Sequence, residues 1–308
     1  MKKWILKMLV QKTISFLPYK MKINGLFQKY VTKGVDLNDE HFGYKITHAK
    51  DHINYLLEYK GSTAFDCLEL GTGWYPIVPI ALYLNGANSI HSIDLSAHLT
   101  KASIADTIRK YIDWEAQGKV RDFLPQVIDS HWAELEYIHE HIDQLPLSEI
   151  LDRFKMKLIV GDATKMDFPD NRFDFICSNN TFEHIYPSVL KGILAEFNRV
   201  LKKGGGLMSH FIDMSDHFAH YDKSINIYNF LKYSKSQWDL MDNSIQPQNR
   251  WRFVDYKNLY KELGISIIKE NAWAKEAEKL KTIKVAEMYL SYTQEELAIS
   301  HGYLVSKK

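Results

Sequence analysis

Short apolar runs and helix-spaced apolar positions alternate along the middle of the chain. Residues 65–70 and 89–94 form two such runs, and further apolar strands are expected at residues 158–160 and 173–180. Between the first two runs, four apolar residues follow the spacing of one helix face: Ile77, Ile80, Ala81 and Leu84. Strands that alternate with helices indicate an α/β fold built on a parallel sheet.

The pattern continues into the C-terminal part. Another strand is expected after the glycine turn at residues 204–206, and later strands at 265–270 and 303–305. Helices are expected at residues 225–233 and 256–263, and Gly264 supplies a helix stop for the second of them.

The segment at residues 97–156, between the second and third strands, is longer than a crossover requires. It has about 60 positions, whereas a βαβ connection needs only a dozen or more. Its apolar residues recur at roughly helical spacing, so we expect an inserted helical subdomain. Five of its polar residues could be drawn as metal ligands: His131, Glu134, His139, Glu140 and His141. A solvated helix face is the favoured interpretation, and no metal is expected there.

The turn after the first strand carries candidate chemistry. A strand, a Gly-x-Gly turn at Gly71 and Gly73 and a helix start bring backbone N–H groups close to a nucleotide. Asp94 follows Gly73 by 21 residues, about where a doubly wound fold places the carboxylate that binds ribose hydroxyls. Pro76 stands where a dinucleotide fold needs its third glycine. The turn therefore disfavours a nicotinamide cofactor and suits an adenosine with a non-phosphate tail.

With these residues the chain resembles the class I S-adenosylmethionine (SAM)-dependent methyltransferases of the type 11 kind. Five segments match the family's motifs in the right order: Glu69–Gly73, Asp94 with Leu95, residues 161–164, residues 173–185 and residues 200–206. The resemblance implies a doubly wound, Rossmann-like sheet of seven strands with the last strand antiparallel. It also implies SAM as the cofactor.

The resemblance assigns cofactor contacts residue by residue. Leu95 would pack on the adenine, Asp162 would accept from the adenine amino group, and Asn179 would contact the methionine part. The full set of expected cofactor residues is Glu69, Gly71, Thr72, Gly73, Asp94, Leu95, Asp162, Ala163 and Asn179.

Candidate acceptor and catalytic residues follow the fourth and fifth strands. Three histidines and three aspartates occur within residues 210–222, at the edge of the sheet where ligands bind in such folds. Asp213 with His217 could act as a general base, could ligate a divalent cation that holds a diol, or could serve only as turn residues. His184, after the fourth strand, is a second candidate catalytic residue, with a helix-start role as the alternative. His210 and Arg250 are candidate acceptor contacts, the latter for an anionic acceptor.

The composition of the chain limits the classes of partner and the compartment that we expect. A net charge of +1 does not predict a nucleic-acid partner, and two cysteines in buried strands suit a cytoplasmic protein.

We divide the chain into a basic helical extension, residues 1–58, and a methyltransferase domain, residues 59–308. Residues 1–35 hold eight lysines and no acid. This segment is expected to cover the cofactor cleft; the alternative is that residues 1–20 contact an anionic membrane surface.

The expected reaction is methyl transfer to a small-molecule or glycan-type acceptor. The absence of an Asn-Pro-Pro-Tyr motif at residues 178–181 argues against nucleobase or glutamine amide methylation. We expect O-methylation. N-methylation of a small molecule and a non-catalytic SAM-binding module remain alternatives.

Overall fold

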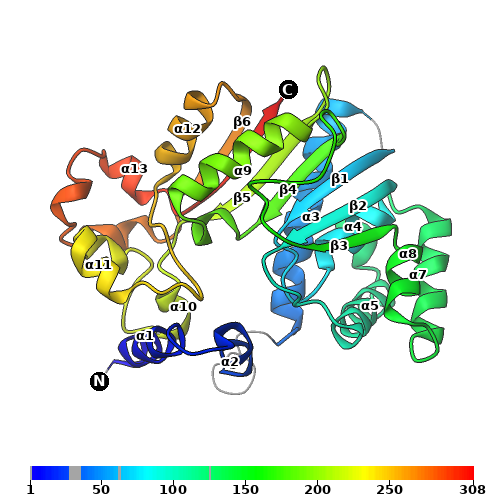
Figure 1. Ribbon diagram of the computed structural model, residues 1–308, viewed down its shortest axis with the longest axis horizontal. Coiled ribbons are helices and arrows are strands. Elements are labelled where there is room, and N and C mark those ends of the chain that lie inside the picture. Colours follow the sequence, from blue (N-terminus) through cyan, green and yellow to red (C-terminus); the bar gives the residue numbers. More distant parts are fainter. Residues whose placement is uncertain (1, 28–35, 62–63, 125) are drawn as a thin grey trace. The chain divides into compact units, whose positions relative to one another are not determined.

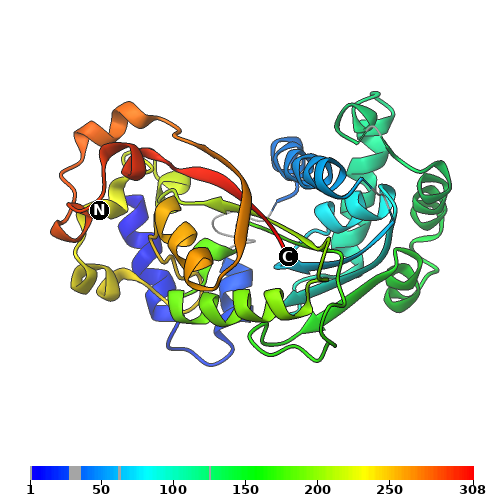
Figure 2. The ribbon, with the colours of Figure 1, turned by 90° about the horizontal axis from the view of Figure 1, so that it is seen from above.

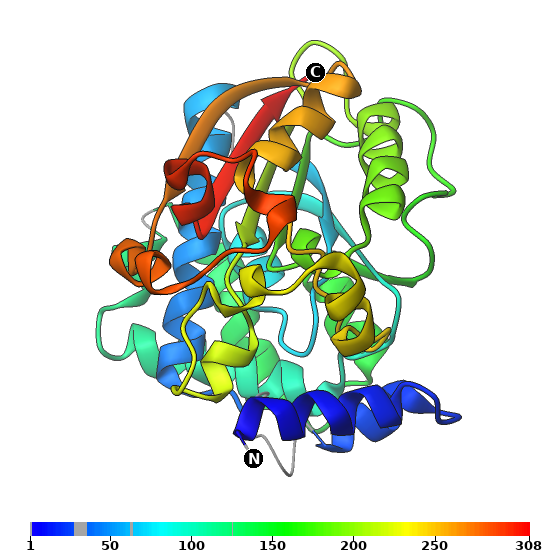
Figure 3. The same ribbon diagram turned by 90° about the vertical axis from the view of Figure 1, so that its left-hand side faces the viewer.

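The computed structural model describes residues 2–27, 36–61, 64–124 and 126–308 (Figure 1). Seven strands form one sheet in the order β3-β2-β1-β4-β5-β7-β6. β1 pairs in parallel with β2 and β4, and β2 pairs in parallel with β3. The last strand runs opposite to β5 (Figure 3), so the predicted doubly wound sheet is confirmed. The strands are β1 Phe65–Leu70, β2 Ala87–Asp94, β3 Met156–Val160, β4 Phe175–Asn179, β5 Leu207–Asp213, β6 Ser266–Trp273 and β7 His301–Lys307.

The chain divides into two compact units. The first comprises Met1–Val35, Asn180–Lys191 and Phe211–Leu304, and the second comprises Asp36–Asn179, Gly192–His210 and Val305–Lys308. Both units draw on distant parts of the sequence. The division expected at residue 58 stays a prediction.

The second unit contains strands β1 to β4 and the helices α3 to α8. α4 begins directly after Pro76 and is buried along its whole length, as its apolar sequence predicts. The expected helical insert is present between β2 and β3. Its helices α5, α7 and α8 lie beside the end of the sheet that β3 and β2 form (Figures 1 and 2). The helices are α3 Asp39–Lys60, α4 Ile77–Leu84, α5 Lys101–Glu115, α6 Val120–Phe123, α7 Asp129–His141 and α8 Leu147–Arg153; α9 Pro187–Val200 begins in the first unit and ends in the second.

The first unit is built from short helices around an aromatic core. Tyr228, Phe230, Trp238 and Tyr289 are among its buried residues. The helices are α1 Lys3–Ile14, α2 Lys20–Phe27, α10 Phe218–Tyr221, α11 Lys235–Met241, α12 Phe253–Glu262 and α13 Gln294–Ala298, with 3-10 helices η2 Phe182–His184, η3 Asn229–Lys232, η4 Ala277–Thr282 and η5 Glu287–Tyr289.

The prediction of a helix at residues 225–233 is wrong. Only the 3-10 helix η3 forms there, because side chains capture the backbone N–H groups that a helix would need. Asp222 Oδ1 accepts from the Ser224 N–H at 2.9 Å, and Asn226 Oδ1 accepts from the Tyr228 N–H at 3.0 Å. Such Asx turns compete with helix formation.

α1 is an amphipathic helix whose inner face packs on α10 and α11 within the first unit (Figure 3). Trp4, Met8 and Ile14 are buried, and the Trp4 N–H donates to Asp222 Oδ2 at 3.0 Å. The expected placement of this segment over the cofactor cleft stays a prediction. Two of the eight lysines, Lys29 and Lys33, lie outside the described residues. Within the described ranges, no helix combines the length and apolarity that crossing a membrane would require.

Candidate active site

The glycine turn after β1 has the backbone that a nucleotide site requires. Gly71 and Gly73 have φ values of 79° and 69°, which glycine adopts without the steric cost of a side chain. A Cβ at Gly73 would meet nothing within 4 Å, so this face of the turn is open. The Thr72 hydroxyl donates to Glu69 Oε2 and fixes the turn against the end of β1. Glu69 is only 3% exposed, and burial raises the pKa of its carboxyl group to about 7.

The structure brings Asp94 to this turn, as the spacing predicts. Asp94 Oδ2 accepts from the Gly73 N–H at 3.4 Å, and Oδ1 accepts from the Ser96 N–H at 3.2 Å. The following residue, Leu95, is 79% exposed, although most side chains of its size and apolarity are buried in this unit. An exposed apolar side chain beside a carboxylate is a suitable arrangement for binding adenosine, because the apolar side chain can pack on the base and the carboxylate can accept from the ribose.

Asp162 and Ala163 reach the same edge of the sheet from β3. The Gly161 N–H donates to the Asp94 carbonyl at 3.0 Å, which joins the end of β3 to the end of β2. The Thr164 N–H donates to Asp162 Oδ1 at 2.8 Å and lowers the pKa of that exposed carboxyl group. Ala163 is buried. The residues present therefore fit the adenosine part of the cofactor that the resemblance implies.

Asn179, at the end of β4, is held by a histidine that the sequence did not single out. His52 on α3 approaches Asn179 Oδ1 with Nε2 at 3.0 Å and Ser209 Oγ with Nδ1 at 2.7 Å. Because an amide oxygen only accepts, Nε2 carries the proton and Nδ1 accepts from the serine hydroxyl. Burial lowers the pKa of His52 to about 4, which keeps the ring neutral.

The two predicted acceptor contacts are both engaged in packing. His210 is fully buried in β5, where Nδ1 lies 2.8 Å from Ser178 Oγ and the ring stacks on Phe197. Arg250 is 6% exposed, and its guanidinium donates to the Phe230 and Tyr233 carbonyls at 3.0 Å and 2.7 Å. The acceptor roles of His210 and Arg250 stay predictions that this burial does not support.

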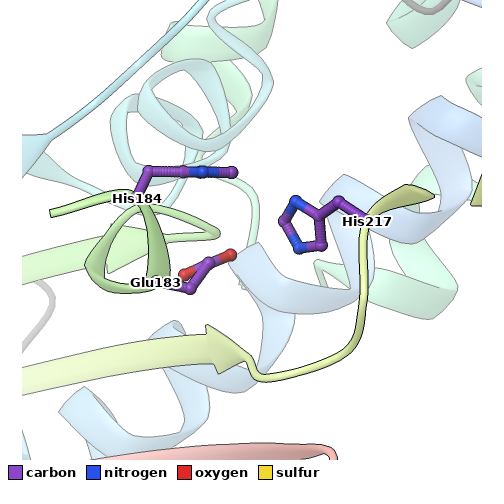
Figure 4. Close-up of side chains that lie close together, drawn as sticks. All are labelled: Glu183, His184 and His217. Carbon is purple, nitrogen blue, oxygen red and sulfur yellow. The ribbon is translucent and has the colours of Figure 1, made fainter. Parts of the chain in front are cut away.

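The first unit brings the predicted catalytic residues His184 and His217 together. Figure 4 shows Glu183 and His184 on the η2 turn and His217 after β5, with their side chains close to one another. The two imidazole rings meet edge to face at 4.7 Å between centroids. The His184 Nδ1–H donates to the Pro247 carbonyl at 2.7 Å, so the neutral ring carries its lone pair on Nε2.

A small pocket opens beside these histidines, entirely within the first unit. Its lining includes Lys7, Gln11, His184, His217, Trp238 and Gln248. Burial lowers the pKa of Lys7, whose ammonium lies 5.2 Å from the centre of the Tyr221 ring. Among the described residues no acidic side chain forms an ion pair with Lys7. From the sequence alone, Lys7 was only one of the lysines of a basic segment, and no role in a pocket was predicted for it.

Asp213 and His217 lie close to each other without forming the hydrogen-bonded pair of a general base. His217 Nε2 is 3.6 Å from Asp213 Oδ2, which is longer than a hydrogen bond. His220 and His301 also approach this carboxylate, at 3.6 Å and 3.4 Å. Burial opposes ionisation of Asp213, but its interactions with His220, His217 and His301 outweigh this effect and hold the pKa of the carboxyl group well below its usual range. Burial lowers the pKa of His217 to about 3.

The comparisons with known proteins agree with this geometry. A family model described as "Methyltransferase domain" matches residues 68–209, which run from β1 into β5 and include all nine expected cofactor residues. Residues 68–209 therefore form a methyltransferase domain of the SAM-dependent kind. SAM is the cofactor of such domains, as the resemblance implied.

Individual relatives of this methyltransferase are distant. The PH0226 protein from Pyrococcus horikoshii is 17% identical, with 91% of this chain and 97% of that chain covered and a TM-score of 0.50. The 1,6-didemethyltoxoflavin-N1-methyltransferase of Burkholderia thailandensis is 12% identical, with 94% and 88% covered and a TM-score of 0.48. A sterol 24-C-methyltransferase of Gibberella zeae is 47% identical over 51 residues, which are 17% of this chain and 13% of that enzyme. Similarity at this level leaves the acceptor atom of the present methyltransferase open.

Proposed function

We propose that this methyltransferase transfers a methyl group to an oxygen atom of a small polar molecule or a glycan building block. The observation that carries the proposal is the small pocket whose lining includes the Lys7 ammonium and two histidines, His184 and His217. A hydroxyl acceptor needs a group that takes its proton, and this pocket offers one.

The second unit would hold the cofactor through residues already described. The open turn at Gly71 and Gly73 would approach it, Asp94 would accept from the ribose hydroxyls, and Asp162 with Leu95 would hold the adenine. When bound, SAM supplies a methyl group that its sulfonium has already activated. The protein's remaining work is to align the acceptor, to exclude water and to remove a proton.

His184 is the residue we assign to proton removal. Its Nδ1–H is committed to the Pro247 carbonyl, so Nε2 is the atom that can accept a proton from an acceptor hydroxyl. The 2.7 Å bond also fixes the ring orientation. A hydroxyl is a poor nucleophile until this proton is drawn away, whereas an amine acceptor would depend less on His184.

Lys7 is the residue we assign to acceptor binding. A largely buried ammonium without a carboxylate partner is costly unless a ligand supplies the opposite charge or strong acceptors. We therefore expect an acceptor that carries a carboxylate, phosphate or sulfate group, or a dense set of hydroxyls. This assigns to Lys7 the anion-binding role that the sequence had suggested for Arg250.

The proposal is tested with labelled SAM and a panel of anionic sugars, phenols and amines. We expect transfer to a hydroxyl, and we expect His184→Ala to lower kcat by roughly 10²- to 10⁴-fold. SAM affinity, measured by calorimetry, should be unchanged. Lys7→Met should raise KM for the acceptor, while the matched Lys3→Met, at an exposed position of the same helix, should not.

Two outcomes would contradict these assignments. Wild-type kcat in His184→Ala would exclude that residue as the base. Transfer to amines alone would establish the N-methylation alternative, and SAM binding without transfer to any class would favour the non-catalytic module.

We also propose that α1 touches an anionic membrane surface peripherally. Its outer face exposes Leu6 and Leu9, which are 52% and 47% exposed, close to the exposed Lys2 and Lys3. Phe16 and Tyr19, just after the helix, are more than three-quarters exposed. Apolar side chains flanked by lysines are typical of helices that bind anionic lipid surfaces.

A further inference from the structure

Asp213, His217 and His220 form a compact cluster of metal-ligating side chains in the first unit. Asp213 closes β5, and the two histidines follow at positions i+4 and i+7, at and within the short helix α10. Their donor atoms all lie within 4.8 Å of one another. The Asp213 side chain is 8% exposed, that of His217 is 19% exposed and that of His220 is 52% exposed, so the cluster is closed on one side and open on the other.

The distances within the cluster do not correspond to hydrogen bonds. Asp213 Oδ2 is 3.6 Å from His217 Nε2 and 3.6 Å from His220 Nε2, beyond the range of an N–H···O bond. A tetrahedral ion with bonds of about 2.1 Å holds neighbouring ligand atoms about 3.4 Å apart. The two carboxylate–imidazole separations are therefore close to those that a tetrahedral ion would require, and the two imidazole nitrogens lie within 4.8 Å of each other.

The surroundings of these atoms suit a ligand role. The second carboxylate oxygen, Oδ1, accepts from the Ser215 N–H at 2.9 Å, which orients Oδ2 toward the histidines. His217 Nε2 is buried and has no hydrogen-bond partner among the described residues. His220 Nε2 lies 3.1 Å from Ser215 Oγ, and an ion would take the place of that hydrogen bond.

We propose that Asp213, His217 and His220 bind a divalent transition-metal ion of the zinc type. Two imidazole nitrogens and one carboxylate oxygen are ligands that zinc and other first-row transition metals prefer, whereas magnesium and calcium prefer oxygen ligands. Three protein ligands leave a fourth position, which the exposed side of His220 makes accessible to water or to a substrate oxygen.

A competing set shares one of these ligands. Glu183, His184 and His217 also bring three donor atoms within 4.8 Å of one another (Figure 4). His217 Nε2 can serve one ion, and we assign it to the Asp213 set, whose carboxylate oxygen lies 3.6 Å away. In that arrangement His184 is not a ligand of the ion.

The ion would also bear on the acceptor, because His217 lines the pocket that contains Lys7 and His184. An acceptor hydroxyl on the fourth position would lose its proton more easily, since a bound cation lowers the pKa of an oxygen ligand. This consequence rests on the proposed O-methyltransferase function. The binding of the ion does not.

The test is direct metal binding to untagged, chelator-treated full-length protein. Calorimetry with Zn²⁺ should give one site per chain, and Co²⁺ should produce the intense visible bands of a tetrahedral complex. His220→Ala removes a half-exposed ligand without touching the core, and we expect it to weaken binding at least tenfold. His139→Ala, a partly exposed histidine of α7, is the matched control and should bind as the wild type does.

Several outcomes would overturn the site. Wild-type protein that binds neither ion, or binds no more tightly than His220→Ala, would refute it. Binding that survives His220→Ala but is lost in His184→Ala would assign the ion to the Glu183 set instead. Asp213→Asn provides a second variant, with circular dichroism to verify folding. If it folds, it should lose the Co²⁺ spectrum, and an unchanged spectrum would refute the role of Asp213. These readouts need no acceptor, so they are independent of the methyl-transfer assay.

Discussion

Glu69 ends β1 with its carboxyl group enclosed by the fold. Burial raises its pKa from the ordinary 4.5 to about 7, although the Thr72 hydroxyl bond favours the charged form. Below pH 4.5 the group is protonated in both the folded and the unfolded chain. Between pH 4.5 and 7 only the folded chain keeps the proton, so the free energy of unfolding falls as the pH rises through this window.

The difference of about 2.5 pKa units corresponds to roughly 3 kcal/mol. We expect Glu69→Gln, which keeps the size and one acceptor oxygen, to be more stable than the wild type at pH 8 and about equal to it at pH 4.5. Urea unfolding at both pH values measures this. The exposed Glu140→Gln is the control, and a parallel pH profile for Glu69→Gln and the wild type would contradict the prediction.

Local spacing was enough to predict that the glycine turn and Asp94 lie together. Glu69, Gly71 and Gly73 are contiguous, and Asp94 ends the next strand, so parallel strand ends had to bring them together. His301 and Lys7 could not be found in this way. His301 reaches Asp213 only through the sheet order that places β7 next to β5, and Lys7 reaches the pocket only through the packing of α1. Such contacts depend on tertiary structure that no local pattern encodes.

At the scale of elements, the long periodic segments were predicted well and the Asx-rich one was not. The strands and α12 formed within a few residues of their expected bounds. Residues 225–233 did not form a helix, because the side chains of Asp222 and Asn226 bind nearby backbone N–H groups. Apolar spacing signals a helix only where no neighbouring side chain competes for its backbone.

The two faces of α1 separate its structural role from its proposed membrane role. Trp4→Ala removes a buried side chain from the inner face, and we expect a loss of roughly 3 kcal/mol in the free energy of unfolding. Replacing both Leu6 and Leu9 with Glu changes only the outer face. This double variant should keep its stability and lose binding to phosphatidylglycerol vesicles in a sedimentation assay.

Salt and lipid charge give the controls for α1. Binding of the wild type should weaken at high salt and be weaker to phosphatidylcholine alone, because lysines supply part of the attraction. Equal binding to both lipids, or none to either, would remove the membrane proposal and leave α1 as a packing element.

At the scale of the whole molecule, the chain passes between the two units five times, at residues 35/36, 179/180, 191/192, 210/211 and 304/305. β5, β7 and α9 each contribute residues to both units. Neither unit can therefore be formed from one continuous segment. We expect a single cooperative thermal transition by calorimetry and circular dichroism alike, in spite of the division into two units.

That cooperativity determines how a cofactor bound to one unit affects the protein. All nine predicted cofactor residues belong to the second unit, yet S-adenosylhomocysteine should raise the melting temperature of the entire protein. A 100-fold excess over Kd contributes about 2.7 kcal/mol, or roughly 5 °C for a chain of this size. Asp94→Ala should need ~10- to 100-fold more ligand for the same shift, because it loses a charge-assisted hydrogen bond to the ribose. NADH should give no shift. If only part of the signal shifted with S-adenosylhomocysteine, the units would be unfolding separately; if Asp94→Ala responded like the wild type, its carboxylate would not bind the ribose.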